Sequence, residues 1–288
     1  MSIVKLLTTQ GVHLSCEVFP PKEFARVEEV REVVRDIAAL SPAYVSVTYG
    51  AAGNTPHFTR ELAQTVQAAG VPALAHLTCI NDTVSKIGEV LTELETAGVT
   101  NVLALRGDIP PGASFPSGDH FEHAAELVSY VKARGGFCVG AACYPEGHPE
   151  AANRAQDMDY LKAKVDAGVD FLNTQMFFDN ATLYNFMYRA LRAGIRVPIS
   201  AGVMPVVNAK QIRRIAALSG ASLPPRFWSI VDRFGDDPAS MRQAGVAYAT
   251  EQIIDLIANG VNNIHLYTMN RVDVAGDVFR NLGAIAGA

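Results

Sequence analysis

The segment TAGVTNVLALRGD, residues 96–108, contains a structural unit that recurs along the chain. A helical stretch ends at Gly98, a residue type that commonly caps helices, and a largely apolar strand follows at residues 101–106. The strand ends in the polar triplet Arg106-Gly107-Asp108. Most of the other expected strands also follow a helix that ends in glycine, and this unit of helix, glycine and strand repeats about every 30 residues. Strands that alternate regularly with helices are expected to pair in parallel.

Eight such strands can be placed from their apolar residues and the turn residues beside them. They are expected at residues 13–19, 43–48, 72–77, 101–106, 137–142, 170–175, 198–203 and 262–267. Eight parallel strand–helix units predict an α/β fold, a (β/α)8 TIM barrel, which as a single domain would take up residues 1–288. The main alternative is a doubly wound open sheet, although the GxGxxG fingerprint of that fold is absent after the first strand.

Helices are expected between these strands, among them one at 26–39 with apolar residues along one face. The seventh unit is longer than the others. It contains Pro224-Pro225 and the one tryptophan, Trp228. We expect a short extra helical segment near 219–237, packed beside the barrel, and a further helix from 237 to 259.

The composition narrows the class of protein. Of the 288 residues, 49% are hydrophobic and 18% are charged, which is typical of a globular protein with a large core. The net charge of −5 and the lack of a Lys/Arg cluster argue against a nucleic-acid partner. No apolar run approaches the roughly 20 residues of a membrane span. The first residues lack a signal-peptide pattern, and the four cysteines form no CxxC pair, so we expect a cytoplasmic protein.

Polar residues recur where the expected strands end. A parallel barrel would bring them to one mouth, although they are far apart in the sequence. They are Glu17, Thr48, His76, Arg106, Gly107, Asp108, Tyr144, Gln175 and His265.

Glu17 lies between two apolar residues, Cys16 and Val18, in the first strand. Side chains alternate between the two faces of a strand. If Cys16 and Val18 pack toward the helices, Glu17 points into the barrel interior. A carboxyl group in that place is a candidate general acid. The alternative is a carboxylate on an edge strand that faces solvent.

Asp108 and Gln175 each allow two interpretations. Arg106 and Asp108 can pair in a simple surface turn, or Asp108 can belong to a functional site at the mouth, where loops are held by the barrel. The amide of Gln175 can hold the edge of a heterocycle, because it both donates and accepts hydrogen bonds. It can also bond to the backbone of a neighbouring loop.

The polar segment at residues 143–150 leads into a helix that carries Lys162 and Lys164. Residues two apart do not share a helix face, so we expect one of these lysines to point at the mouth. Such a loop suits a cofactor that bears phosphate. His76 and His265 are single histidines on apolar strands, which is more typical of core residues than of metal ligands. We predict no metal.

Taken together, these motifs resemble methylenetetrahydrofolate reductase of the bacterial, FAD-dependent type, a (β/α)8 barrel family. The resemblance covers nearly the whole chain. The matching segments are CEVFPPK (16–22), YVSVTYGAAG (44–53), AHLTCI (75–80), NVLALRGDIPPG (101–112), AACYPEGHPEA (141–151), LKAKVDAGVDFLNTQMFFD (161–179), ISAGVMPV (199–206) and HLYTMNR (265–271).

The resemblance implies an enzyme of one-carbon metabolism and methionine biosynthesis that works with FAD. Reduced FAD would pass a hydride to 5,10-methylenetetrahydrofolate and give 5-methyltetrahydrofolate, and NAD(P)H would reduce the flavin. The residues that match catalytic positions of the family are Glu17, as general acid, and Asp108, beside the flavin. Those that match substrate positions are Gln175, Gln211 and Arg271. Those that match FAD positions are Thr48, Tyr49, Ala51, His76, Arg106, Gly107, Asp108, Phe121, Tyr144, His148, Ala151, Asp157, Tyr160 and Lys164.

Three positions depart from the family pattern. Ile215 replaces a phenylalanine, Ala163 replaces an arginine that often precedes the lysine, and Phe121 replaces a tyrosine. The departures leave the source of electrons open between NADH, NADPH and a partner subunit, as in a larger electron-transfer complex with another flavin or an iron–sulfur protein. We also expect a homo-oligomer.

Overall fold

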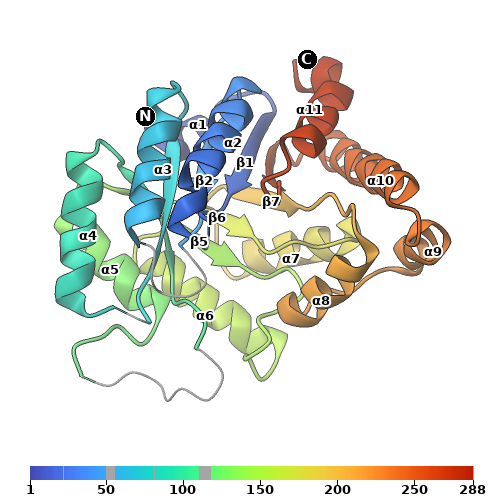
Figure 1. Cartoon of the computed structure of the whole chain (residues 1–288). Coiled ribbons are helices and arrows are strands. Elements are labelled where there is room, and N and C mark those ends of the chain that lie inside the picture. Colours follow the sequence, from blue (N-terminus) through green and yellow to red (C-terminus); the bar gives the residue numbers. More distant parts are fainter. Residues whose placement is uncertain (22, 50–55, 81, 110–117, 288) are drawn as a thin grey trace.

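The computed structural model describes residues 1–21, 23–49, 56–80, 82–109 and 118–287, with the backbone alone at 24, 56, 213, 214, 217 and 218. Eight parallel strands pair in sequence order, and β8 pairs with β1, so the sheet closes (Figure 1). The predicted TIM barrel is therefore confirmed, and the alternative of an open sheet is wrong. The strands are β1 (His13–Val18), β2 (Val45–Val47), β3 (Ala73–Thr78), β4 (Asn101–Leu105), β5 (Cys138–Cys143), β6 (Phe171–Thr174), β7 (Ile199–Val203) and β8 (Asn263–Tyr267).

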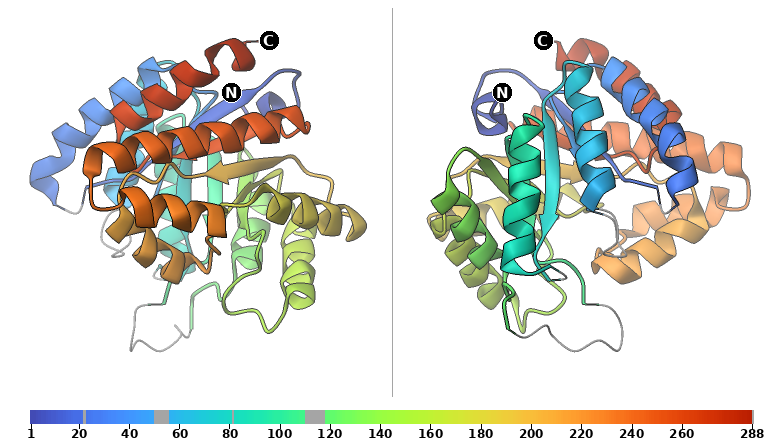
Figure 2. Two further views of the ribbon diagram at one scale, coloured as in Figure 1. Left: turned by 90° about the vertical axis from the view of Figure 1, so that its right-hand side faces the viewer. Right: turned by 60° about the vertical axis from the view of Figure 1, so that its left-hand side comes forward.

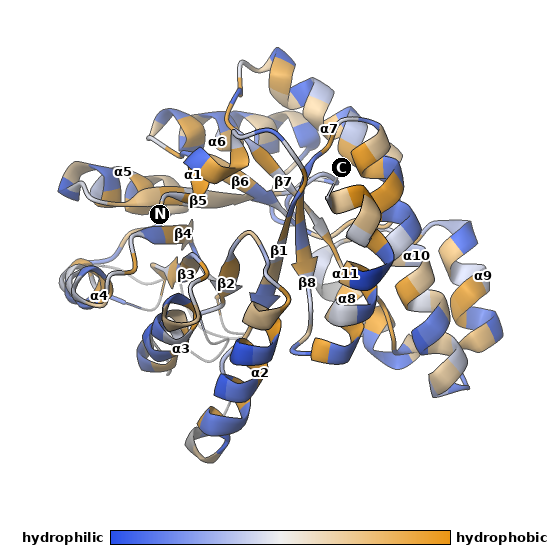
Figure 3. Ribbon diagram, turned by 90° about the horizontal axis from the view of Figure 1, so that it is seen from above, coloured by the Kyte–Doolittle hydropathy of each residue, from blue (hydrophilic) through white to orange (hydrophobic). Residues whose placement is uncertain are grey.

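Helices surround the barrel on its outer side (Figure 3). One of them, α9, lies in the segment where an extra helix was predicted, at the edge of the molecule farthest from α4 (Figures 1 and 3). The helices are α1 (Ile3–Leu7), α2 (Val27–Ala39), α3 (Pro56–Ala68), α4 (Val84–Thr96), α5 (Ala124–Arg134), α6 (Arg154–Asp166), α7 (Asn180–Arg192), α8 (Ala209–Ser219), α9 (Pro225–Phe234), α10 (Pro238–Ala258) and α11 (Val272–Ala286), with a 3₁₀ turn η1 (Phe24–Arg26) before α2.

The main core lies between the strands and the helices. Cys16 and Val18 of β1 are buried there against apolar residues of α2, such as Val34 and Ile37. Because side chains alternate along a strand, this packing turns Ser15 and Glu17 toward the barrel axis. Figure 2 shows α10 and α11 side by side where the ring of helices closes after β7 and β8. None of the described helices combines the length and the apolar character needed to span a membrane.

The amino-terminal end of the barrel is filled with apolar side chains. Tyr44, Leu74, Leu103 and Phe171 form a buried cluster there, and Ile3 of the short helix α1 packs against it. Gly140 of β5 makes room for this cluster, since a Cβ atom at that position would lie 2.5 Å from Cζ of Phe171. The interior is therefore a packed core, and a ligand can enter only at the opposite end, where the strands terminate.

Candidate active site

The carboxylate of Glu17 lies inside the barrel mouth. Its Oε2 atom is 3.6 Å from Nε2 of His76 on β3 and 3.9 Å from Nε2 of His265 on β8. The side chain is 20% exposed, so the carboxylate sits at the boundary between core and solvent. The predicted inward orientation of Glu17 is confirmed. Three strands that are distant in sequence bring one acid and two imidazoles together.

The two histidines have different surroundings. The Nδ1 atom of His265 is 2.8 Å from the hydroxyl of Ser15, and its Nε2 atom is 3.1 Å from that of Ser46. Its ring stacks on Tyr44. His265 is thus a core histidine with both nitrogens hydrogen-bonded.

His76 is buried, and its Nε2 atom has no hydrogen-bond partner among the described residues. Burial lowers the pKa of His76 to about 4, although the nearby carboxylate of Glu17 acts in the opposite direction. His76 therefore presents a neutral imidazole at the mouth near pH 7. A buried polar atom without a partner in the protein is a natural contact for a bound ligand.

Tyr267 at the end of β8 extends the floor of the mouth. Its hydroxyl donates to the carbonyl oxygen of Thr174 at 2.6 Å. Burial, and then the charge of Glu17, raise the pKa of Tyr267 well above its ordinary value, so the phenol stays protonated. Tyr267 was not predicted as a site residue, although it ends an apolar strand in the same way as the others and lies in the segment HLYTMNR.

Arg106 follows β4, and its side chain is tied to another loop. Its two terminal nitrogens donate to the carboxylate of Glu150 at 2.6 and 2.7 Å. The hydrogen bonds and charge of Glu150 raise the pKa of the guanidinium, and the charge of Asp108 adds to this, against the effect of burial. The partner of Arg106 is therefore Glu150, and Asp108 is left exposed beside the pair.

The backbone turn between Arg106 and Asp108 requires a glycine, which is Gly107. Its φ angle is +90°, which favours glycine. A Cβ atom there would also lie 2.8 Å from Cγ2 of Ile80. Gly107 thus fixes the turn from which Arg106 and Asp108 diverge.

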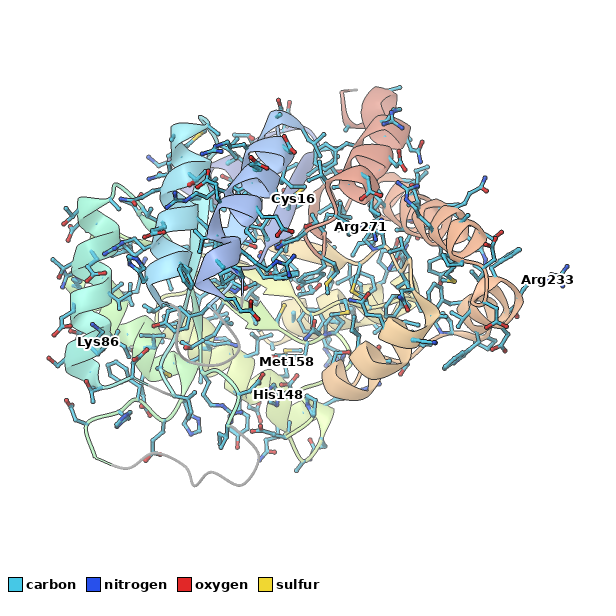
Figure 4. All side chains as sticks on the ribbon, viewed as in Figure 1. Cys16, Lys86, His148, Met158, Arg233 and Arg271 are labelled. Carbon is cyan, nitrogen blue, oxygen red and sulfur yellow. The ribbon has the colours of Figure 1, made fainter. Side chains whose placement is uncertain are left out.

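A cavity of about 470 Å³ opens between the end of β4, the loop after β5 and α6. Half of the predicted FAD positions line it, including His148 on the loop after β5 (Figure 4). His123 and Glu150 also line this cavity and were not predicted. The predicted residues in the lining are Arg106, Tyr144, His148, Ala151, Asp157, Tyr160 and Lys164.

The polar groups of this cavity are partly withdrawn from water. Nζ of Lys164 donates to the carbonyl of Ala142 at 2.6 Å, whereas Lys162 pairs with Asp166 on the surface. The expectation that one of these two lysines points at the mouth is confirmed. Burial lowers the pKa of Lys164 and raises that of Asp157. The protein thus holds a lysine and an aspartate close together in the cavity wall.

Tyr144 and His148 form the aromatic part of the same wall. Their rings meet edge to face, with centroids 4.6 Å apart. Burial, followed by the charge of Asp108, raises the pKa of Tyr144 to about 12. Aromatic side chains of this kind can pack against a flat ring system.

A second cavity, of about 160 Å³, lies between the end of β7, α8 and the start of α11. Two predicted substrate residues, Gln211 and Arg271, line it together with Ile215, Phe19 and Met269.

The two predicted residues of this cavity are held in different ways. The first turn of α8 is capped by Asn208, whose Oδ1 accepts from the backbone amides of Lys210 and Gln211. Arg271 makes two hydrogen bonds to Asp273, at 2.9 and 2.8 Å, and it is drawn above and to the right of His148 in Figure 4.

Some predicted residues line neither cavity. Thr48 accepts a hydrogen bond from Thr59, and the Tyr49 hydroxyl donates to Asp82. The ring of Phe121 packs on Tyr130 of α5. Ala51 lies outside the described residues.

Gln175, after β6, also lines neither cavity. Its Oε1 atom accepts from the backbone amide of Met176 at 3.0 Å. This is the loop-backbone bond raised as an alternative, and it leaves the side-chain amide nitrogen available.

No group of three or more His, Cys, Asp or Glu side chains in the described part of the chain could hold a metal ion. The residues fit a flavin dinucleotide better. Arg106 and Lys164 supply cationic donors of the kind that bind phosphate, Tyr144 and His148 supply rings, and His76 supplies an unpaired nitrogen beside Glu17.

The chain is similar to proteins of one known family. A family model described as methylenetetrahydrofolate reductase matches residues 2–283. The chain is 33% identical over 284 residues to the 5,10-methylenetetrahydrofolate reductase of Escherichia coli (strain K12), with 98% of this chain and 95% of that protein covered. It is 35% identical over 300 residues to methylenetetrahydrofolate reductase (NADH) 1 of Zea mays, of which it covers 51%.

A solved structure shares the fold at low sequence identity. It is an uncharacterized protein from Clostridium thermocellum that binds two copies of 5-methyl-5,6,7,8-tetrahydrofolic acid. The TM-score is 0.64 at 12% identity, with 100% of this chain and 99% of that chain covered. At this identity the likeness shows the fold alone.

Proposed function

Because the chain belongs to the methylenetetrahydrofolate reductase family, we propose that it reduces 5,10-methylenetetrahydrofolate to 5-methyltetrahydrofolate with the help of bound FAD, which NAD(P)H reduces. FAD, when bound, supplies the hydride chemistry, and the protein supplies placement and proton transfer. The observation that carries the proposal is the position of Glu17, a carboxylate inside the barrel mouth at 3.6 Å from His76.

Glu17 is the group best suited to deliver a proton at this place. The hydroxyl of Tyr267 is bound to Thr174, and its raised pKa makes it a poor acid. His76 is neutral near pH 7, because its pKa is lowered to about 4, and so it holds no extra proton to give. In the proposed reaction Glu17 supplies the proton that N10 of the folate takes up when the bond between N10 and the methylene carbon breaks. The five-membered ring opens, and the methylene carbon stays on N5, where it accepts the hydride.

The larger cavity is the proposed FAD site. Arg106 and Lys164 would hold the diphosphate, with Tyr144, His148, Ala151, Asp157 and Tyr160 around the rest of the cofactor. Asp108, exposed beside Arg106, would lie at the flavin. The other proposed cofactor contacts are Thr48, Tyr49, Ala51, His76, Gly107 and Phe121.

The smaller cavity is the proposed place for part of the folate. Gln211 and Arg271 line it, and Gln175 would contact the substrate from the end of β6. The guanidinium of Arg271 suits the carboxylates of the glutamate tail, which would compete with Asp273 for its donors. We also propose that the protein works in the cytoplasm as a homo-oligomer.

Substitution of Glu17 by Gln tests the proposal. The purified, FAD-loaded protein is mixed anaerobically with NADH, and the reduced protein is then mixed with methylenetetrahydrofolate, while the flavin absorbance is followed. We expect Glu17→Gln to leave flavin reduction within about twofold and to slow flavin reoxidation by at least about a hundredfold, the usual effect of losing a general acid. Glu32→Gln, on the exposed face of α2, is the matched control and should behave as the wild type.

Equal loss of both half-reactions in Glu17→Gln would show that Glu17 has a structural role. A wild-type flavin that dithionite reduces and neither NADH nor NADPH does would favour a partner subunit as the electron donor. Ile215 motivates this second source of electrons, because it lines the smaller cavity and the family resemblance predicts a phenylalanine at that position. Protein that cannot be loaded with FAD would contradict the proposal as a whole.

A further inference from the structure

The guanidinium of Arg106 faces the larger cavity with most of its hydrogen-bonding capacity in use. Its Nε atom donates to the carbonyl of Gly107 at 3.1 Å. Its two terminal nitrogens donate to the two carboxylate oxygens of Glu150 at 2.6 and 2.7 Å. An arginine has five N–H donors in a rigid fork, so two are left for an incoming group.

The two members of this ion pair differ in exposure. The Arg106 side chain is 20% exposed, whereas that of Glu150 is 59% exposed. Glu150 belongs to the loop between β5 and α6, where its backbone amide donates to Nδ1 of His148 at 3.2 Å. The cation is therefore fixed in the cavity wall, and the carboxylate can turn into solvent when this partly exposed ion pair is broken, which costs some of the binding energy of an incoming anion.

Among the described residues that line the cavity, the formal charges of the lysine, arginine and carboxylate side chains cancel. Its two cations are Arg106 and Lys164, and its two carboxylates are Glu150 and Asp157. Asp157 and Lys164 act on each other electrostatically, as Glu150 and Arg106 do. A diphosphate that enters this cavity meets no surplus of positive charge, and Glu150 occupies the donors that would bind it most directly.

On the basis of the proposed function, we propose that Glu150 acts as an internal anion that competes with the phosphate groups of FAD for Arg106 and so weakens the binding of the cofactor. Glu150 would then set how tightly FAD binds and how readily it is exchanged. A phosphate oxygen and the Glu150 carboxylate cannot both take the same two N–H donors of Arg106.

The opposite role would be a support, in which Glu150 holds Arg106 in the orientation that FAD needs. The two roles predict opposite changes when the charge of Glu150 is removed. Competition predicts tighter binding of FAD, whereas support predicts weaker binding. Glu150→Gln keeps the size of the side chain and one acceptor oxygen, and it removes the charge.

The experiment is a titration of the FAD-free protein with FAD, followed by quenching of the flavin fluorescence. We expect Glu150→Gln to lower the Kd for FAD by roughly three- to tenfold, as for removal of one repulsive charge at a partly exposed site. The Kd for riboflavin, which has no phosphate, should change by less than about twofold. Asp159→Asn removes one exposed negative charge from α6 outside the cavity and is the matched control.

Three results would overturn the proposal. They are an unchanged or higher Kd for FAD in Glu150→Gln, an equal gain with riboflavin, and an equal gain in Asp159→Asn. In each of these cases the wild type still binds FAD, so the proposed function stands and the role of Glu150 alone is rejected. A wild-type chain that binds no FAD would reject both.

Discussion

At the scale of single residues, the position of the Tyr267 ring at the barrel mouth depends on Gly202. A Cβ atom at Gly202 of β7 would lie 2.5 Å from the carbonyl oxygen of Thr174 and 2.6 Å from Cε2 of Tyr267. The missing side chain is what allows Tyr267 to lie across the floor and to donate to Thr174. The place of Tyr267, whose hydroxyl feels the charge of Glu17, thus depends on the absence of a methyl group at position 202.

Gly202→Ala should therefore disturb the floor. Both close atoms belong to the packed interior, so we expect the free energy of unfolding to fall by about 1–3 kcal/mol, the usual cost of overpacking. The KM for methylenetetrahydrofolate should rise as Tyr267 is displaced. Urea unfolding and steady-state kinetics measure the two effects.

Gly283→Ala is the control for that change. A Cβ atom at Gly283 of α11 would meet no neighbouring side chain within 4 Å, so alanine should be neutral or should stabilise the helix by about 0.5–1 kcal/mol. If the two variants unfold at the same urea concentration, the close contacts at Gly202 carry no strain.

Some features of the candidate site could be predicted from the sequence, and others could not. The inward direction of Glu17 follows from strand alternation, and the choice between Lys162 and Lys164 follows from helix geometry. Both are local rules. The pairing of Arg106 with Glu150 joins two loops that are 44 positions apart, and no local pattern determines it.

At the scale of elements, helix α6 carries the proposed cofactor residues Asp157, Tyr160 and Lys164, and its first turn is capped by a side chain. The side chain of Asn153 accepts hydrogen bonds from the backbone amides of Ala155 and Gln156. Asn153 is exposed and does not line the larger cavity. Its effect on the site is therefore expected to pass through the helix.

Asn153→Ala should remove this cap. We expect the free energy of unfolding to fall by about 1 kcal/mol, the usual contribution of an N-cap, and the Kd for FAD to rise as the first turn of α6 frays. Calorimetry and flavin titration are the measurements. Asn153→Ser keeps a capping oxygen and should restore most of both quantities. A Kd that is unchanged in Asn153→Ala would show that the cap does not position the cofactor residues.

The elements themselves were largely predictable. All eight strands lie within two residues of their predicted ends, because apolar runs between turn residues are a strong signal. The short helix α1 was not predicted, since its five residues are too few for a helical period to show. It forms because Ile3 packs into the buried cluster at the amino-terminal end of the barrel, so tertiary packing stabilises this helix.

At the scale of the whole molecule, the repeating unit of helix, glycine and strand was enough to predict a closed barrel and a single functional mouth. The division of that mouth into two cavities was not predictable. It depends on where the loops after β4, β5 and β7 lie relative to one another. Glu17 lies in the barrel mouth, and the larger cavity is lined by seven of the predicted cofactor residues.

If the proposed function is right, the barrel mouth brings Glu17 and the larger cavity to the same bound ring system. A crystal structure of the protein with FAD and 5-methyltetrahydrofolate decides this. We expect FAD in the cavity of Arg106, Tyr144 and Lys164, with the folate ring next to the carboxylate of Glu17. A structure in which FAD binds elsewhere, or in which Glu17 contacts neither molecule, would contradict it.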